Sequence, residues 1–258
     1  IHLKTGVKND GTFTAWQMKV VDGVGAYSSG TATLKLMCGF FMSQYRCPNK
    51  YFEGYAVYTN TPPLGSMRGA GNPEANYCTE LQMDIIAKKL GMDPTELKLK
   101  NHIREGDTYY GQGPDIYSVI KSCGTEQLIR EGRKWIDWDR PKSWTPDPDR
   151  PWIKRGLGMA IGNHTSGTSS AESKTPSQFM IDYSGAIMKM NTDGTMNLIT
   201  PSAEMGTGAL MVDVAVAAEA AGLKYEDIIL VDSNTDIAPW DHGTMASRHT
   251  FGMGNAVR

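Results

Sequence analysis

The sequence has little cysteine, no long hydrophobic run and almost no net charge, and each shortage excludes a class of protein. Its four cysteines, at positions 38, 47, 78 and 123, form no CxxC pair, so neither a structural zinc site nor an iron–sulfur cluster is indicated. Free, buried thiols are expected instead. No apolar stretch is long enough to cross a bilayer, which predicts no membrane contact and favours the cytoplasm.

The charge balance argues against nucleic acid as a partner. The 258 residues carry a formal net charge of -2, and no basic run with interleaved aromatic residues occurs. With 40% hydrophobic and 21% charged residues, the chain can bury one large core or two modest ones. A folded, globular protein is therefore expected.

Two common enzyme signatures are also missing. No GxSxG nucleophile motif occurs, and neither His164 nor His242 has a nucleophile at motif spacing, which disfavours a hydrolase. The segment GAGNPE lacks the GxGxxG pattern, which disfavours a dinucleotide-binding domain.

The most informative segment present is a glycine-rich loop that contains Arg68 and leads into a helix. Helix starts collect unpaired backbone N–H groups and the positive end of the helix dipole. Gly69, Ala70 and Gly71 can bring such donors close to an anionic or electron-rich ligand, and Arg68 adds a planar cation. The alternative reading of Arg68 is a surface salt bridge.

The helix after this loop shows start and stop signals. Asn72 is expected to cap it, Pro73 suits its first turn, and Gly91 ends it. Its apolar face is predicted to comprise Leu81, Ile85 and Leu90. A second helix is predicted at once, with Asp93 as cap and Glu96 as capping-box partner.

The overall pattern predicts an α+β fold of mixed sheets with helices packed on them. A turn at Asn9–Gly11 predicts one hairpin, and residues 186–190 and 196–199 predict another. Each hairpin region is accompanied by a glycine loop and a helix, RGAG in one case and EMGTG before residues 209–221 in the other. This is a weak internal repeat that indicates two related lobes.

The segment from Thr59 to Asn101 resembles the molybdenum hydroxylases, the xanthine dehydrogenase and aldehyde oxidase group. That family has a TNTPP-to-RGxG loop, a helix and a phrase like LGMDPxELRxKN in its large subunit. The residues that fit are Thr59, Asn60, Thr61, Pro62, Pro63, Arg68, Gly69, Gly71, Glu80, Asp84, Ala87, Leu90, Gly91, Met92, Asp93, Pro94, Glu96, Leu97 and Asn101. The opening residues, MNTDGTMNLITPSAEMGTGALMVDVAVAAEAAGL and DIAPWDHGTMASRHTFGMGNAV resemble further family segments in the same order.

The resemblance implies two lobes of a molybdenum cofactor-binding domain. Residues 1–122 would be the C-terminal part of the first molybdopterin-binding lobe, and residues 123–258 the N-terminal part of the second, with a Pro/Trp-rich linker at 137–155. The family's GGFGGK-like and GxGE-like segments do not occur, and the latter holds its catalytic glutamate. The chain is thus expected to be a central fragment, without catalytic residues of its own, that alone neither holds molybdopterin tightly nor turns over substrate.

The resemblance further implies the cofactors and partners. The chain would bind molybdopterin with molybdenum, expected in the cytosine dinucleotide form, and FAD and [2Fe-2S] centres would lie on partner domains or subunits. The pterin sulfurs hold the metal in this family, so no metal-ligating residues are expected here. The implied reaction hydroxylates an aldehyde, an N-heterocycle or an aromatic acyl-CoA thioester with water as the oxygen source. Other partners would be a small-molecule substrate and the rest of the molybdopterin-binding subunit.

In the first contact loop, the resemblance places Met67, Arg68, Gly69 and Ala70 beside the molybdenum ligands. Many purine and aldehyde enzymes of the family have phenylalanine where this chain has Ala70. The smaller residue leaves more room above the metal, so a purine held between aromatic rings is less expected.

In the second loop, Met205, Gly206, Thr207 and Gly208 match the family's MGQG segment, with Thr207 in place of glutamine. The hydroxyl is shorter than the amide, so one pterin hydrogen bond must shift or pass through water. The alternative is a plain strand-to-helix turn. Glu204 is rejected as a general base, because a carboxylate beside a helix start is explained by the dipole.

In the third loop, Ala246, Ser247, Arg248 and Thr250 would lie along the pterin and its phosphate. Hydroxyls and a bidentate arginine are residue types that phosphate recognition prefers. His249 alone is more often a packed or surface histidine.

Two further alternatives stay open at this point. Residues 163–176, rich in serine, threonine and glycine, could form an access loop or a solvated connection. The chain could also be a noncatalytic scaffold or subunit-interaction module derived from the family.

Overall fold

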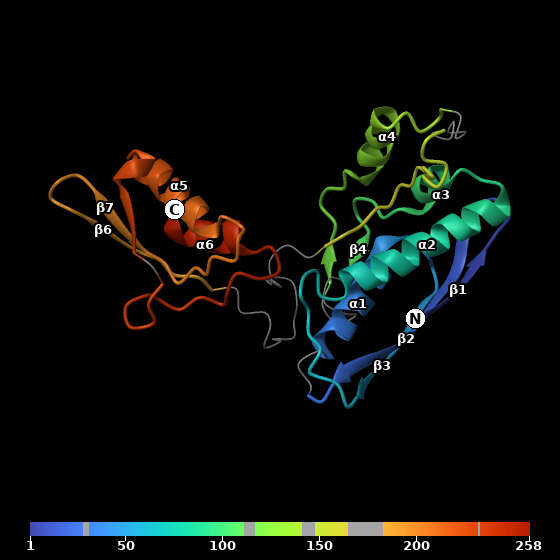
Figure 1. Cartoon of the computed structure of the whole chain (residues 1–258), viewed down its shortest axis with the longest axis horizontal. Coiled ribbons are helices and arrows are strands. Elements are labelled where there is room, and N and C mark those ends of the chain that lie inside the picture. Colours follow the sequence, from blue (N-terminus) through green and yellow to red (C-terminus); the bar gives the residue numbers. More distant parts are fainter. Residues whose placement is uncertain (28–30, 111–116, 141–147, 165–182, 232) are drawn as a thin grey trace. The chain divides into compact units, whose positions relative to one another are not determined.

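The computed structural model describes residues 1–27, 31–110, 117–140, 148–164, 183–231 and 233–258 (Figure 1). These residues form two compact units, residues 1–164 and 165–258, each of which is described by itself. The predicted segment 163–176 lies outside the described residues from position 165 onward. No helix of the described residues is long and apolar enough to cross a membrane.

The first unit contains a three-stranded sheet in the order β1-β2-β3. Strands β1 (His2–Val7) and β2 (Phe13–Gly25) pair antiparallel, as the turn signal predicted, with Gly11 in the left-handed region at φ 83°. Helix α1 (Thr31–Gln44) connects β2 to β3 (Lys50–Tyr58), which pairs parallel to β2. A parallel pair needs such a crossover, because a tight turn can only reverse the chain.

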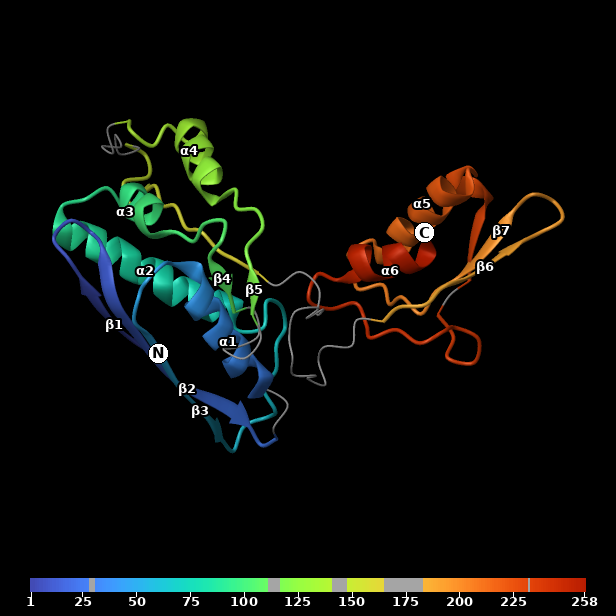
Figure 2. The ribbon, with the colours of Figure 1, turned by 180° about the vertical axis from the view of Figure 1, so that it is seen from behind.

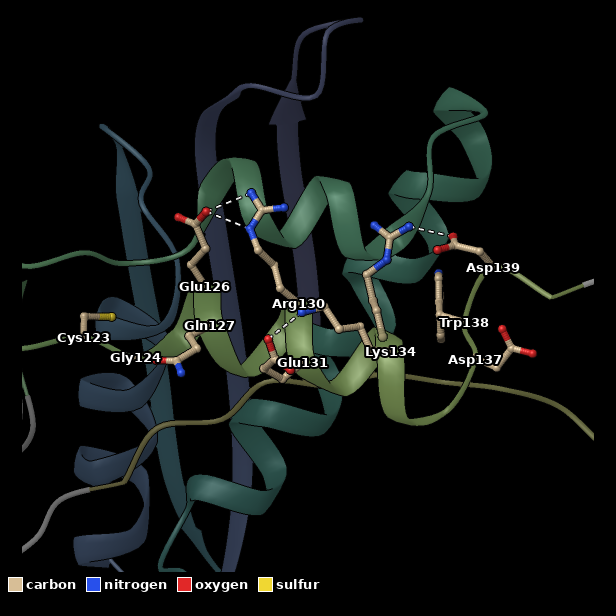
Figure 3. Close-up of a pocket in the computed structure, with 11 residues that line it drawn as sticks. Cys123, Gly124, Glu126, Gln127, Arg130, Glu131, Lys134, Asp137, Trp138 and Asp139 are labelled. Carbon is tan, nitrogen blue, oxygen red and sulfur yellow. Dashed lines mark hydrogen bonds and ion pairs between the residues drawn. The ribbon is translucent and has the colours of Figure 1, made fainter.

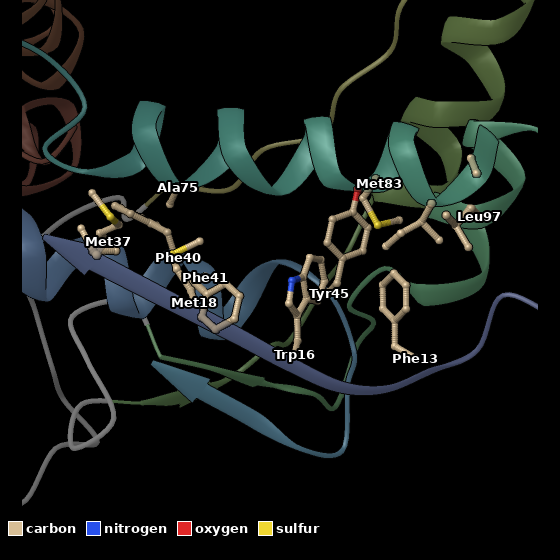
Figure 4. Packing of buried hydrophobic residues seen from close by; sticks show 13 residues of the cluster. Phe13, Trp16, Met18, Met37, Phe40, Phe41, Tyr45, Ala75, Met83 and Leu97 are labelled. Atoms are coloured by element: carbon tan, nitrogen blue, oxygen red, sulfur yellow. The ribbon is translucent and has the colours of Figure 1, made fainter. Parts of the chain in front are cut away.

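Helix α1 and helix α2 (Asn72–Leu90) cover one face of this sheet, and the core lies between them and β2 (Figure 4). Helix α2 is followed by α3 (Pro94–Asn101). The aromatic ring of Trp16 packs against the rings of Phe41 and Tyr45, at centroid distances of 5.7 and 5.8 Å. The buried cluster comprises Phe13, Trp16, Met18, Val20, Met37, Phe40, Phe41, Tyr45, Ala75, Met83, Ile86, Ala87 and Leu97.

Two details predicted for α2 are wrong. The N-cap residue is Gly71 and makes no side-chain cap bond, while the side chain of Asn72 turns inward and donates to Asn163 O. The residues predicted to form the buried face are wrong in part, because Leu81 and Ile85 are 48% and 43% exposed. The buried face is instead formed by Ala75, Thr79, Met83, Ile86 and their neighbours. Because some of these residues are small or polar, the spacing of large apolar residues did not predict this face.

The predicted end of α2 and the predicted N-cap of α3 are confirmed, whereas the predicted capping box at Glu96 is not formed. Gly91 closes α2 in the left-handed conformation, at φ 64°. Asp93 Oδ1 accepts hydrogen bonds from the backbone N of Thr95 at 2.8 Å and of Glu96 at 3.4 Å, as an N-cap does. The side chain of Glu96 bonds to Arg133 instead of closing a capping box.

The rest of the first unit contains two short strands, β4 (Thr108–Tyr109) and β5 (Ser118–Val119), and helix α4 (Thr125–Trp135). Trp138 is buried, and its Nε1 donates to Asp93 Oδ2 at 2.8 Å, which ties the segment after α4 to the start of α3. The described residues of the predicted linker, 137–140 and 148–155, contain no helix or strand. Residues 123–164 pack with the first unit, whereas the lobe boundary near residue 122 stays a prediction.

The second unit repeats the strand and helix order of the first (Figure 2). Strands β6 (Ile187–Met190) and β7 (Met196–Ile199) form the predicted antiparallel hairpin. Helix α5 (Ala209–Ala221) and a short 3-10 turn, η2 (Tyr225–Asp227), then lead to β8 (Ile228–Val231), which pairs parallel to β7. Helix α6 (His249–Val257) follows.

The repeat differs from the predicted one in how the helices correspond. Each unit has the order strand, strand, helix, parallel strand, helix, so α5 corresponds to α1 and α6 corresponds to α2. The RGAG loop before α2 therefore corresponds to the loop before α6 that contains Ser247, and not to EMGTG.

Candidate functional site

The loop before α2 has three consecutive residues in the left-handed region. Their φ angles are 89° at Gly69, 45° at Ala70 and 85° at Gly71. A Cβ at Gly71 would lie 2.4 Å from Thr33 O, so only glycine lets this turn approach α1 so closely. Ser66 Oγ accepts from Ala70 N at 2.9 Å and holds the strained residue.

This loop presents its predicted contact residues to solvent. Met67 is 92% exposed, and Arg68 is exposed as well. Gly69 and Ala70 are half-buried beneath them. The backbone is thus fixed from inside, while the side chains available to a ligand lie on the outer surface.

The loop before α5 is organised around Glu204. Gly206 and Gly208 adopt φ angles of 84° and 77°, and Glu204 accepts from Gly208 N at 3.0 Å and from Leu210 N at 3.4 Å. These backbone donors, Gly208 N first, lower the pKa of the Glu204 carboxyl. The geometry agrees with the reading of Glu204 as a partner of the helix start.

The predicted contacts of the second loop, Met205, Gly206 and Thr207, lie on the surface, and Gly208 is half-buried. A Cβ at either glycine would meet no atom within 4 Å, so the glycines serve backbone conformation and leave open space beside them.

The loop before α6 turns through Ala246 and Ser247, whose φ angles are 48° and 54°. Two adjacent non-glycine residues in the left-handed region are uncommon and need support from their surroundings. Ser247 and Thr250 are exposed, while Arg248 between them is fully buried.

The buried guanidinium of Arg248 bonds within the protein. Its NH1 donates to Asp241 Oδ1 at 2.9 Å and to Gly243 O at 3.0 Å, and its NH2 donates to Ser184 Oγ at 2.7 Å and to Tyr183 O at 3.2 Å. Burial alone would raise the pKa of the Asp241 carboxyl, but hydrogen bonds from Ser184, Arg248 and Gly243 lower it on balance. The ion pair between Arg248 and Asp241 fixes the path of residues 241–248. A contact between Arg248 and a cofactor phosphate stays a prediction.

His249 joins the third loop to the second. Its Nε2 lies 2.9 Å from Asp213 Oδ1 and 3.3 Å from Ala209 O, the first residue of α5. Ser202 Oγ donates to Asp213 Oδ2 at 2.6 Å. The structure therefore brings the starts of α5 and α6 together through a buried histidine, in line with the packed alternative considered for His249.

Asp213, Asp241 and Ser202 were not singled out by the sequence, because their partners are 7 to 57 positions away along the chain. The first predicted loop belongs to the first unit and the other two belong to the second. The convergence of all three loops on one ligand stays a prediction.

A surface pocket of about 840 Å³ lies elsewhere, along α4 (Figure 3). Two ion pairs lie within its lining, Arg130 with Glu126 at 2.8 Å and Lys134 with Glu131 at 2.7 Å. None of its lining residues belongs to the three loops. A solvated, internally paired helix face of this kind indicates no ligand.

Among the described residues, no group of three or more His, Cys, Asp or Glu side chains is placed to hold a metal ion. This finding leaves open a metal that is held by sulfur atoms of a cofactor.

Known families match almost the whole chain. Residues 1–102 and residues 131–258 each match the model of a molybdopterin cofactor-binding domain. The xanthine dehydrogenase molybdenum-binding subunit of Escherichia coli O157:H7 is 32% identical over 256 residues, which are 98% of this chain and 32% of the relative. The aldehyde oxidoreductase of Megalodesulfovibrio gigas is 31% identical over 263 residues, 100% of this chain and 27% of the relative.

Solved structures agree with this assignment. An aldehyde oxidoreductase structure from Desulfovibrio gigas matches with a TM-score of 0.75 at 29% identity, and one from Desulfovibrio desulfuricans with 0.77 at 28%. Each match covers 99% of this chain and 27% of the other. The chain thus spans about a third or less of the length of these relatives.

The two matched domains place the chain in the class of molybdopterin-binding proteins. More specifically, the chain belongs to the molybdenum hydroxylase family, the group of xanthine dehydrogenases and aldehyde oxidoreductases, and comes from its molybdopterin-binding region.

Proposed function

We propose that this chain forms the central part of the cofactor site of an enzyme that hydroxylates a small organic substrate with oxygen from water. The observation that carries the proposal is the left-handed backbone at the predicted contact loops, which precede α2, α5 and α6 in a chain of this family. Successive residues in such turns can gather backbone N–H groups on one side, and this arrangement suits an anionic or electron-rich cofactor.

The residues present fit molybdopterin. Arg68 offers an exposed cation, and Thr207, Ser247 and Thr250 have hydroxyls on the surface. The open space beside Gly206 leaves room for a bulky group at the backbone. Arg248 contributes from within, because its ion pair with Asp241 shapes the loop that presents Ser247.

The roles that we assign follow from these positions. Molybdopterin, when bound, supplies the two-electron redox chemistry of the hydroxylation. Met67 and Arg68, with the backbone of Gly69 and Ala70, line the metal end, and Arg68 stabilises negative charge there. The loops at Met205–Gly208 and Ala246–Thr250 hold the pterin and its tail.

The substrate is proposed to be an aldehyde, an N-heterocycle or an aromatic acyl-CoA thioester. The methyl group of Ala70 is small, so it leaves space above the metal end for a substrate that is not clamped between aromatic rings. The relatives named above act on xanthine and on aldehydes, which supports a choice among carbonyl and heterocyclic compounds.

The remaining parts of the proposal concern the whole protein. We propose a cytosine dinucleotide form of the cofactor, and FAD and [2Fe-2S] centres on partner domains or subunits that carry electrons away. The rest of the molybdopterin-binding subunit completes the site, and a cytoplasmic location is proposed.

A noncatalytic module derived from the family is the second candidate. Two observations favour it: the bonds of Arg248 that the structure shows are internal, and Glu204 occupies backbone donors at the start of α5. Both reduce the donors left for an anionic cofactor at the second and third loops.

Metal and pterin analysis of the purified protein that carries this chain separates the two candidates. The proposed function predicts equal molar amounts of molybdenum and pterin in the purified protein. It also predicts turnover of an aldehyde or a heterocycle when a panel of substrates is tested. The noncatalytic candidate predicts neither metal nor pterin.

A matched pair of variants tests Arg68 itself. Arg68→Gln should lower the retained molybdenum, whereas Arg130→Gln, which removes an exposed cation paired with Glu126, should not. Equal molybdenum content in both variants would show that Arg68 does not contribute to cofactor binding.

A further inference from the structure

Helix α2 buries a row of polar side chains beneath the first loop. They occupy successive turns on one face of the helix and meet α1 and the returning segment 161–163. We call this set the polar seam, and its members are Gln44, Asn72, Asn76, Thr79, Glu80 and residues 161–163.

At one end of the polar seam, both carboxylate oxygens of Glu80 are hydrogen-bonded. Glu80 Oε1 accepts from Gln44 Nε2 at 2.9 Å and from Tyr45 OH at 2.5 Å, and Glu80 Oε2 accepts from Ile161 N at 3.1 Å. The buried Nζ of Lys98 lies 3.1 Å from Glu80 Oε2 and 3.1 Å from Asp84 Oδ1. Because the side chain of Asp84 is 51% exposed, this end of the seam reaches solvent.

The outer end of the polar seam lies at the start of α2. Asn72 Nδ2 donates to Asn163 O at 2.5 Å, and Asn76 Nδ2 donates to Asn72 Oδ1. Asn72 follows Gly71 directly, so the seam ends behind the loop that carries Arg68.

Several side-chain atoms of the seam have no protein partner. In the described part of the chain, nine buried side-chain nitrogen and oxygen atoms have no hydrogen-bond partner, and five of them belong to the seam. The five atoms are Gln44 Oε1, Asn76 Oδ1, Thr79 Oγ1, Asn163 Nδ2 and Asn163 Oδ1. Buried polar groups almost always have a partner, so five such atoms on four residues of the seam require an explanation.

Reassigning the amide orientations of Asn163 and Gln44 does not provide partners for their unpaired atoms. Turning the Asn163 amide only exchanges two atoms that both lack partners. Turning the Gln44 amide would place its oxygen against Glu80 Oε1 and Ile161 O, which are both acceptors. Water can satisfy such groups, because a buried water typically makes about three hydrogen bonds as donor and acceptor.

We propose that the polar seam is a binding site for ordered water molecules, which bridge Gln44 Oε1, Thr79 Oγ1, Asn76 Oδ1 and the Asn163 amide. These waters form a hydrated path from the Glu80–Lys98 pair to the start of α2. The path supplies water, and a route for protons, to the loop that carries Arg68. This supply role rests on the proposed function, whereas the water sites themselves do not.

A high-resolution crystal structure of the purified protein tests the water sites. Waters within hydrogen-bond distance of at least two of the four residues, bridging one to the next, are the expected result. Direct pairing of these atoms with protein groups, or a dry seam with the atoms left unpaired, overturns the proposal.

Two threonine variants provide the matched comparison. Thr79→Val keeps the side-chain shape but removes a hydroxyl of the seam, and Thr200→Val does the same at a buried, unpartnered hydroxyl of the second unit. The Thr79→Val structure should lose the water next to position 79, and the Thr200→Val structure should keep every water of the seam. An unchanged seam in Thr79→Val contradicts the proposal; if that variant does not fold, Asn163→Leu serves the same comparison at the outer end.

The outcomes separate this inference from the proposed function. Waters in the seam of a protein that contains no molybdenum would support the site and reject the proposed function. A molybdenum-loaded protein with a dry seam would keep the proposed function and reject the site. If both hold, turnover should fall in Thr79→Val and not in Thr200→Val, with the same molybdenum content in each.

Discussion

His249 Nε2 lies 2.9 Å from Asp213 Oδ1, and this buried contact joins α6 to α5. His249 is 8% exposed and Asp213 is fully buried, with Ser202 bonded to the second carboxylate oxygen. The pair fixes the starts of two helices, and therefore the two predicted contact loops of the second unit, in one arrangement.

The first prediction follows from this pair. His249→Ala removes one partner of a buried carboxylate and should lower the free energy of unfolding by about 1–3 kcal/mol, with faster amide exchange at residues 246–250. Asp213→Asn, which keeps the shape and an acceptor, should cost less. Urea unfolding and hydrogen exchange measure both effects, and wild-type values for His249→Ala would show that the contact does not hold the loops.

A second prediction concerns the glycine that shapes the first loop. Gly71→Ala places a Cβ 2.4 Å from Thr33 O at a φ of 85°, so it strains the turn and also pushes it away from α1. Gly91→Ala is the control, because it has a φ of 64° but no atom within 4 Å of the new Cβ.

The control should lose about 1 kcal/mol of stability from backbone strain alone, and Gly71→Ala should lose clearly more. Thermal or urea unfolding of the two variants decides the matter. Equal losses of stability in the two variants would mean that the close contact with Thr33 O adds no destabilisation.

A third prediction is a pH dependence at Lys50. Burial lowers the pKa of Lys50 to about 8, and its Nζ donates to the carbonyls of Met42, at 2.6 Å, and Tyr45. In the unfolded chain the pKa of a lysine is about 10.4. Between these values the folded protein binds fewer protons than the unfolded one, so this group makes the free energy of unfolding rise with pH.

Urea unfolding at several pH values, compared with Lys50→Met, isolates this contribution. The difference between wild type and variant should grow in favour of the wild type from about pH 8 to about pH 10, by roughly 2–3 kcal/mol. A difference that does not change with pH would place the Lys50 pKa at its ordinary value.

Local signals in the sequence predicted much of the fold. The hairpin turn at Gly11, the cap at Asp93 and the helix end at Gly91 depend on residues within a few positions of one another, and all three are confirmed. The fold class is confirmed for the same reason: repeated hairpins and helices indicate mixed sheets.

The features that the sequence did not predict depend on distant partners. Arg248 bonds to Ser184 across 64 positions, and Trp138 bonds to Asp93 across 45. No local pattern marks such pairs. The correspondence of α2 with α6 was also missed, because it rests on strand order and not on the glycine motifs themselves.

The central claim is that the loops at Arg68, Thr207 and Ser247 bind one molybdopterin. A crystal structure of the molybdopterin-loaded protein that carries this chain tests it most directly. The account predicts hydrogen bonds from all three loops to a single cofactor, with Arg68 at its metal end. A cofactor bound elsewhere, or one that touches none of these loops, would contradict it.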